Sequence, residues 1–199
     1  METELRIVQY AELGTLYLPY YRFFQKMYGK TVFARYIETL LEKGEKVPVI
    51  IGKLDDCYDK AVNAVNSVHH SFDNVMLGIY DLEGHLLAVG RIKLGLPSNK
   101  SNAIVGETII IDENMTDAQK TELYASFIKG VEEAVSGLKD IELLTFEVPK
   151  YDDAFETSVN ELGYDLDEED TRWQVTSLYD KNLRERALVR SLENVAPRE

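Results

Sequence analysis

The 199-residue chain is poor in the residues that hold small proteins together through covalent or metal bonds. Cys57 is the single cysteine, so no internal disulfide can form, and three histidines are too few for a usual four-ligand zinc site. No apolar run approaches the roughly 20 residues that span a membrane, and the N-terminus lacks the basic start of a signal peptide. We therefore expect a cytoplasmic protein with no metal ion and no membrane partner.

Basic residues are also scarce. Lys and Arg total 22 against 35 Asp and Glu, which gives a formal net charge of −13. A general nucleic-acid binder must offer cations to phosphates, so this class is excluded as a partner. Disorder is excluded as well, because 45% of the residues are hydrophobic and 12 tyrosines and 7 phenylalanines supply material for a core. The length favours a single domain.

The predicted elements begin with helices and continue as a mixture of strands and helices. Apolar residues at helical spacing predict helices over 11–28, 31–43, 55–70, 116–136 and 152–162, the first bent at Pro19. Apolar runs between turn residues predict strands over 5–10, 48–52, 75–81, 86–94, 103–111, 141–148, 164–166 and 172–179. From Lys181 onward a charged tail follows, which can be helical. The mixture predicts an α+β fold, α/β-like in part, with a mixed central sheet flanked by helices.

Four segments match the pattern of one known superfamily. They are Tyr21-Arg22-Phe23-Phe24 with Tyr28-Gly29, the strand ending in Ala88-Val89-Gly90, the junction Glu161-Leu162-Gly163-Tyr164, and the segment from Thr176 to Leu183. In this order they resemble the GNAT superfamily of acyl-CoA-dependent N-acyltransferases. The resemblance implies one GNAT-like domain over residues 1–182, with the helix near 55–70 as an insertion, and a charged tail over 183–199. It also implies that strands 103–111 and 141–148 are parallel neighbours, joined by the helix over 116–136, and separate at their C-terminal ends.

The resemblance is weakest where the family binds the pyrophosphate of CoA. Family members place Gln/Arg-x-x-Gly-x-Gly/Ala after the fourth strand, and its glycines let backbone N–H groups approach the phosphates. Here the stretch from Asp112 to Lys120 contains no glycine and no arginine, and Asp112, Glu113 and Asp117 stand where the anion would dock. Like charges disfavour such a ligand. We expect acetyl-CoA to bind weakly or not at all, and most weakly at low salt.

The cofactor-binding residues that the resemblance implies lie at the end of the fourth strand and the start of the next helix. Backbone amides around Ile110 and Ile111 would hold the pantetheine arm. The helix N-terminus at Thr116, Asp117 and Lys120 would hold the pyrophosphate. Thr116 begins a capping box, in which its hydroxyl bonds a backbone N–H while a glutamine three residues later reaches back.

The resemblance implies one catalytic residue, whereas the residue at a second catalytic position of the family cannot act as an acid in this chain. Glu107 matches the acidic position on the fourth strand that often acts as base, and Gly106 beside it suits the family's strand bulge. The family's frequent general acid, a tyrosine, falls on Val159, which cannot protonate a leaving thiolate. Tyr151 and Tyr164 are the alternatives for this role.

Two functions from different classes follow. The first is an acetyl-CoA-dependent N-acetyltransferase acting on a small-molecule or peptide amine, which Glu107 and the helix cap favour. A cationic amine is expected, because the acidic run from Asp165 to Asp170 can attract cations, although such a run is also typical of a solvated hairpin tip. The alternative is a catalytically inactive GNAT-fold binding or regulatory module, which the missing glycines and Val159 favour.

Overall fold

The structure is a computed structural model of the chain, and it describes residues 2–28, 32–70, 74–95, 102–138, 140–149, 152–166 and 185–191. Within it the chain divides into two compact units. The first comprises residues 1–7, 73–174 and 185–199, and the second comprises residues 8–72 and 175–184. The described part of the first unit contains all the strands, and that of the second is helical.

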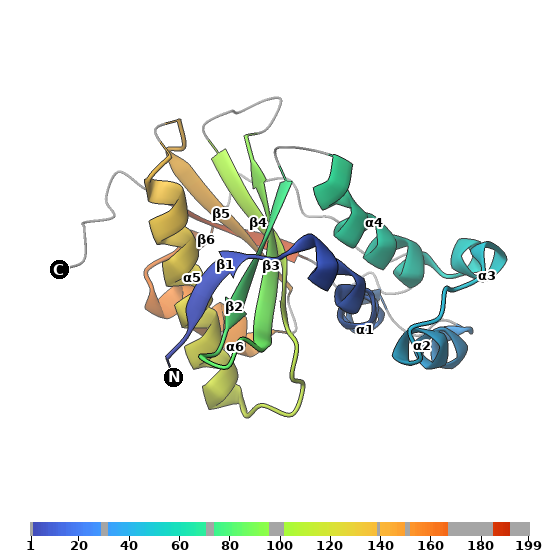
Figure 1. The fold of residues 1–199 in the computed structure, drawn as a ribbon. Helices are drawn as coiled ribbons and strands as arrows, with labels where there is room; N and C mark the ends of the chain where they lie inside the picture. The colour runs from blue at the N-terminus through green and yellow to red at the C-terminus, as the bar shows by residue number, and fades with distance from the viewer. Residues whose placement is uncertain are drawn as a thin grey trace. The chain divides into compact units, whose positions relative to one another are not determined.

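A mixed sheet of seven described strands forms the first unit, in the order β1-β2-β3-β4-β5-β7-β6 (Figure 1). Neighbouring strands are antiparallel except β4 and β5, which are parallel. The strands are β1 (Glu4–Ile7), β2 (Asn74–Tyr80), β3 (Leu86–Leu94), β4 (Asn102–Ile110), β5 (Leu143–Pro149), β6 (Asp165–Leu166) and β7 (Glu185–Ser191). This sheet confirms the expected α+β class with a mixed central sheet.

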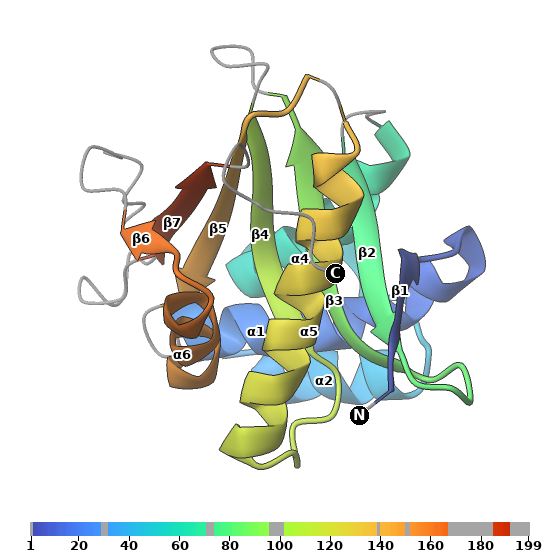
Figure 2. The ribbon, with the colours of Figure 1, turned by 90° about the vertical axis from the view of Figure 1, so that its left-hand side faces the viewer.

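Helices α5 (Asp117–Ser136) and α6 (Asp153–Glu161) cover one face of this sheet (Figure 2). Alternate strand residues point into the core beneath them, including Val105 on β4 and Phe146 on β5, both fully buried. The α5 helix begins at the expected capping box, in which the Thr116 hydroxyl accepts the Gln119 N–H at 3.3 Å and Gln119 Oε1 accepts the Thr116 N–H at 2.9 Å. No helix among the described residues is long and apolar enough to cross a membrane.

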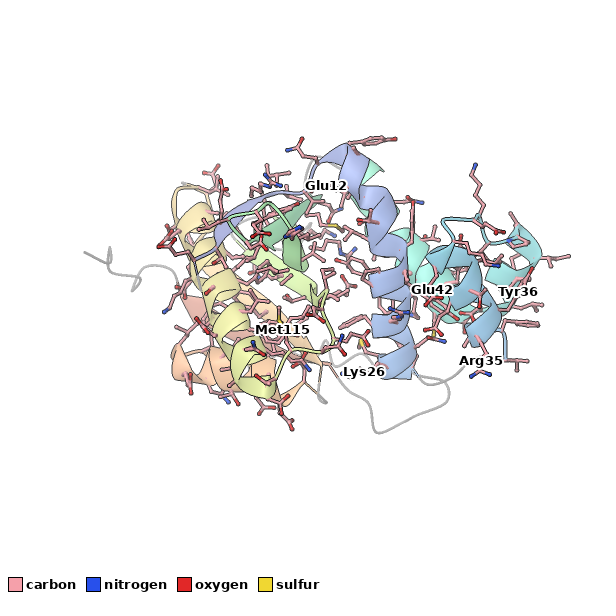
Figure 3. The ribbon with its side chains drawn as sticks, turned by 60° about the horizontal axis from the view of Figure 1, so that its bottom comes forward. Glu12, Lys26, Arg35, Tyr36, Glu42 and Met115 are labelled. Carbon is pink, nitrogen blue, oxygen red and sulfur yellow. The ribbon has the colours of Figure 1, made fainter. Side chains whose placement is uncertain are left out.

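The second unit consists of a 3-10 helix, η1 (Tyr10–Leu16), and the helices α1 (Tyr17–Tyr28), α2 (Ala34–Glu42), α3 (Val49–Leu54) and α4 (Asp56–His70). The expected helix over 11–28 is therefore two helices, with Pro19 in the first turn of α1, where a missing N–H costs nothing. An ion pair of 2.8 Å between Arg22 and Glu42 joins α1 to α2. Figure 3 shows Glu42 on the α1 side of α2, and Arg35 and Tyr36 on the other side.

Two expectations about local structure were wrong. The strand expected over 48–52 is the start of α3, because Val49 and Ile50 are about three-quarters exposed (75% and 74%) and pair with no strand. Residues 185–191 of the expected charged tail form β7, not a helix, and pair with β5 on one side and β6 on the other. This segment forms a strand in spite of its charged residues, because hydrogen bonds to β5 and β6 satisfy its backbone N–H and C=O groups. The strand expected over 172–179 and the segment from Thr176 to Leu183 lie outside the described residues.

Candidate functional site

The parallel pair of strands at the centre of the sheet separates halfway along its length. Pairing between β4 and β5 runs from Asn102–Leu143 to Val105–Phe146, yet β4 continues to Ile110 and β5 to Pro149. Figure 2 shows the two strands adjacent at one end and apart at the other. We call the unpaired part the split. Parallel pairing, the connecting helix α5 and separation at the C-terminal ends are all confirmed as expected.

A β-bulge interrupts β4 at the beginning of the split. Arg91 pairs with Gly106 and Val89 pairs with Ile109, so two residues of β4, Glu107 and Thr108, lie opposite the single intervening residue of β3. Glu107 has φ +43°, and it is the one non-glycine residue with positive φ among those the structure describes. A backbone of this kind costs about 1–3 kcal/mol and is concentrated at functional sites. The bulge thus lies just after Gly106, which itself stays in register.

The Glu107 carboxylate is held by a guanidinium from the neighbouring strand. Arg91 Nε donates to Glu107 Oε2 at 2.9 Å, and Arg91 Nη2 donates to Glu107 Oε1 at 2.7 Å. The two side chains are 27% and 15% exposed. Two parallel charge-assisted bonds fix both the position and the orientation of the carboxylate. The candidate base is therefore an oriented anion at a strained backbone position.

A second carboxylate reaches the same point from β5. A Cβ atom placed on Gly106 would lie 2.9 Å from Oε2 of Glu147 and 3.9 Å from Nη2 of Arg91. Glu147 thus extends across the split and touches the β4 backbone beside the bulge. Sequence reasoning identified Glu107 but missed Arg91 and Glu147, although each is a charged residue inside a mostly apolar strand (LLAVGRIKL and LLTFEVP).

The charged side chains lie on the face of the sheet away from α5. A Cβ atom on Gly90 would meet Phe127 of α5 at 2.4 Å, and Val105 and Phe146 belong to the core under α5. Because side chains alternate along a strand, the next residues, Arg91, Gly106 and Glu147, point to the opposite face. Helix α5, whose N-terminus follows β4 along the chain, covers the other face of the sheet.

The backbone amides at the end of β4 differ in their direction. The Ile111 N–H is donated to the Leu87 carbonyl of β3 at 2.9 Å. Ala88 and Ile110, the adjacent pair, must then be a non-hydrogen-bonded pair, whose backbone groups point away from each other. The Ile110 N–H consequently points toward the split, where pairing with β5 has ended, whereas the Ile111 N–H is used within the sheet.

The N-terminus of α5 offers few groups to an anion. The capping box uses the Gln119 N–H, and the amides of Asp117 and Ala118 have no intrahelical acceptor. Lys120, one turn further on, is half-buried and carries a positive charge. Asp112 accepts the Asn114 N–H at 2.9 Å, and this local turn replaces the glycine loop of the family.

A buried hydroxyl at the bulge lacks a partner. Thr108 Oγ1, in a residue that is 1% exposed, has no hydrogen-bond partner within the described part of the chain. Leaving such an atom unsatisfied costs about 1–3 kcal/mol. A Cβ atom on Gly90 would lie 3.2 Å from this hydroxyl and 2.4 Å from Phe127, so Thr108 Oγ1 lies in the core under α5 and not at the split. The Ile110 N–H is therefore the group of β4 that is placed to bond the pantetheine arm of CoA, and few groups at the N-terminus of α5 are placed to bond its pyrophosphate.

Of the positions considered for a general acid, the two that the structure describes, Val159 and Tyr164, lie in the core and not at the split. Val159 is fully buried in the core. Tyr164 is 4% exposed and donates its hydroxyl to Oε1 of the buried Glu132 at 2.9 Å, with its ring edge-to-face against Phe146. This tyrosine therefore stabilises the core between the sheet and α5. Tyr151 and residues 167–170 of the acidic run lie outside the described residues.

Neither a family model nor a curated protein matches the sequence. Solved structures do match. They include a spermidine N-acetyltransferase from Vibrio cholerae in complex with CoA and spermine, with 10% identity, a TM-score of 0.58 and 96% of each chain covered. An acetyltransferase from Thermus thermophilus has 12% identity and a TM-score of 0.53, covering 96% of this chain and 97% of that one.

The PaiA N-acetyltransferase from Thermoplasma acidophilum, in complex with coenzyme A, has 14% identity and a TM-score of 0.50, covering 96% of this chain and 99% of that one. The chain therefore has the fold of the GNAT N-acetyltransferases along nearly its whole length, as the sequence resemblance implied.

Proposed function

We propose that this protein is an acyl-CoA-dependent N-acyltransferase that transfers an acetyl group from acetyl-CoA to an amine. The observation that carries the proposal is the split between β4 and β5, with an oriented carboxylate, Glu107, on a bulge at its beginning. The fold is shared with N-acetyltransferases, two of which were solved with CoA. Fold alone does not define function, so the proposal depends on these residues.

In this proposal the two ends of the cofactor contact different parts of the site. The Ile110 N–H bonds the pantetheine arm, while the Asp117 amide and the Lys120 ammonium, at the N-terminus capped by Thr116, face the pyrophosphate. When bound, acetyl-CoA would supply a thioester, an acyl carbon activated for attack by an amine. The transfer forms a C–N bond and breaks the C–S bond, so that CoA leaves as a thiolate and takes up a proton that the nitrogen releases. Glu107 accepts the proton that the acceptor's ammonium nitrogen must lose before it attacks.

The acceptor in this proposal is a cationic amine. Support comes from the acidic balance of the chain, with a net charge of −13, and from the two glutamates at the split. A dispersed negative field raises the local concentration of cations. The spermine bound in the Vibrio cholerae structure is an amine of this class.

A non-catalytic binding module is the second candidate, and one observation favours it. The loop from Asp112 to Thr116 has no glycine, so fewer backbone N–H groups can approach a pyrophosphate. A helix N-terminus alone contributes only about 0.3–1 kcal/mol for an exposed anion. In this reading the fold keeps the split but lacks the affinity for acyl-CoA.

Titration of acetyl-CoA into the full chain by calorimetry, at low and at high salt, separates the two candidates. The acyltransferase predicts saturable binding that strengthens as salt rises, because Asp112, Glu113 and Asp117 repel the phosphates less when screened. Asp117→Asn is expected to tighten binding at low salt, whereas Glu133→Gln, an exposed change near the other end of α5, leaves it unchanged.

Incubation with acetyl-CoA and spermidine, followed by mass spectrometry, then tests transfer. A mass gain of one acetyl group on the amine, lost in Glu107→Gln, is the expected result. Absence of acetyl-CoA binding even at millimolar ligand contradicts the acyltransferase and favours the binding module.

A further inference from the structure

Helix α3 presents apolar side chains to solvent. Val49 and Ile50 are 75% and 74% exposed, and Leu54 is 64% exposed. These three residues and Lys53, which is also exposed, share one face of the helix, because residues three and four positions apart are neighbours on a helix surface. The outer face of α3 therefore consists of three aliphatic side chains and one lysine.

Packing on the opposite face fixes this orientation of α3. Gly52 is buried, and a Cβ atom placed on it would lie 2.9 Å from Cδ1 of Tyr58 in α4. The helix ends at the buried Asp55, whose Oδ1 accepts the Tyr58 N–H at 2.9 Å. A rotation that turned the apolar residues inward would bring a larger side chain against Tyr58 and break this bond. The apolar face of α3 therefore stays directed outward.

Lysines accompany the apolar face. Lys43 and Lys46 precede α3 along the chain and are exposed, as is Lys53 within it. Together with Glu45, the one acidic residue from 43 to 54, these three lysines give the segment a net charge of +2. Among the residues that the structure describes, none forms an ion pair with Lys43 or Lys46. We call residues 43–54 the α3 patch.

The acidic residues of the neighbouring helix α2 are paired elsewhere. Arg22 of α1 forms ion pairs with Glu38 at 3.5 Å and with Glu42 at 2.8 Å. Figure 3 shows Arg35, another exposed cation, on the side of α2 away from Glu42. Residues 8–72 contain eight Lys and Arg and seven Asp and Glu, a net charge of +1, so the rest of the chain carries −14. The α3 patch is thus a basic and apolar surface on an acidic protein.

We propose that the α3 patch binds the surface of a membrane that contains anionic lipids, an inference that is independent of acyl transfer. Val49, Ile50 and Leu54 enter the boundary between the lipid headgroups and the acyl chains, while the lysine ammonium groups bind the headgroup anions. Lysine suits this position, because its stem lies along apolar surface while its charge stays in water. The sequence-based expectation of no membrane partner depends on the lack of a spanning run, which a surface contact does not need.

The size and composition of the α3 patch favour a membrane over a second protein chain. A stable protein interface takes roughly 20–30 residues from each partner and is depleted in lysine. The patch is shorter than this and carries three lysines. Two copies joined patch to patch would place like charges against each other, which disfavours that contact. The acidic remainder of the chain opposes binding only where it comes within about 8 Å of the lipid, the Debye length at physiological salt.

The test is sedimentation of the full chain with vesicles of phosphatidylcholine alone and with vesicles of phosphatidylcholine and phosphatidylserine in equal amounts. We expect binding to the mixed vesicles that weakens as salt rises, and little binding to phosphatidylcholine alone. The double variant Val49→Ser with Ile50→Ser keeps the charge of the patch and should weaken binding about tenfold or more. Leu82→Ser, at a 76% exposed leucine in the turn between β2 and β3, is the matched control and should bind normally.

A second double variant removes charge and keeps the apolar residues. Lys43→Gln with Lys46→Gln should weaken binding to the mixed vesicles about tenfold or more. Lys93→Gln with Lys129→Gln, at exposed lysines of the sheet unit, changes the net charge of the chain equally and should leave vesicle binding unchanged.

Circular dichroism melting identifies any variant that fails to fold. No binding of the wild-type chain to the mixed vesicles would overturn the inference, as would unchanged binding by either folded double variant of the patch. Analytical ultracentrifugation without vesicles tests the other occupant. Self-association that is lost in Val49→Ser with Ile50→Ser would assign the α3 patch to a second copy of the chain, and would overturn the membrane contact.

Discussion

The ion pair between Arg91 and Glu107 should stabilise the bulge by an amount that a double-mutant cycle can measure. Arg91→Met removes both charge-assisted hydrogen bonds and retains much of the side-chain volume. Breaking a fully buried pair costs about 3–5 kcal/mol. Because these side chains are 27% and 15% exposed, water compensates part of the loss, and we expect about 2–3 kcal/mol. Glu107→Gln can keep one hydrogen bond, so we expect a smaller cost of about 1–2 kcal/mol.

The free energy of unfolding is measured by urea denaturation followed with far-UV circular dichroism. The double variant should be less destabilised than the two single changes combined, with a coupling energy of about 1–2 kcal/mol. Arg35→Met, at an exposed position of α2, is the control and should change stability by no more than about 0.5 kcal/mol. A coupling energy near zero would refute the reasoning, because it would mean that the two charges do not stabilise each other in solution.

Three other predictions concern single residues. Gly90→Ala places a methyl group 2.4 Å from a phenylalanine ring of α5, and it should lower the free energy of unfolding in urea by about 1–3 kcal/mol. Gly14→Ala, which has open space around it, should leave the free energy of unfolding unchanged, and equal effects of the two variants would contradict this reasoning. The hydrogen bond and charge of Asp81 raise the pKa of His85 above its ordinary 6.5, and the nearby Glu83 adds a smaller effect in the same direction. The pair therefore contributes stability below that pH and loses it as pH rises through the folded-state value. NMR titration of the ring should show the raised pKa, and Asp81→Asn should reduce the shift. Burial raises the pKa of the Cys57 thiol to about 12. A thiol reagent at neutral pH should therefore label Cys57 only after the protein unfolds, and rapid labelling of the native protein would contradict its burial.

Local signals in the sequence predicted the elements whose structure depends on near neighbours. The capping box at Thr116 and the β2–β3 hairpin around Gly84, which has φ +86°, are examples, because a few adjacent residues determine each. The error over 48–52 has the opposite cause. Val49 and Ile50 favour strands in general, but no neighbouring strand pairs with them here, and a short exposed helix forms instead.

The site could be predicted only in part, because its geometry depends on register between distant strands. Glu107 was found through the family resemblance. Its pairing with Arg91 depends on the β3–β4 register and on the bulge, and the approach of Glu147 depends on where β4 and β5 cease to pair. Neither feature leaves a signal in adjacent residues. The difference between the Ile110 and Ile111 amides arises in the same way, from the alternation of hydrogen bonds along β3 and β4.

The different directions of the Ile110 and Ile111 N–H groups allow the most direct test of the central claim, that the split binds acyl-CoA. In a ¹H–¹⁵N NMR spectrum of the labelled chain, addition of acetyl-CoA should shift the Ile110 amide signal strongly, because its N–H points toward the split. The Ile111 signal should move much less, because its N–H is donated to the Leu87 carbonyl at 2.9 Å. Saturating acetyl-CoA that leaves Ile110 unmoved, or that shifts only residues outside β4, β5 and the start of α5, would contradict the account.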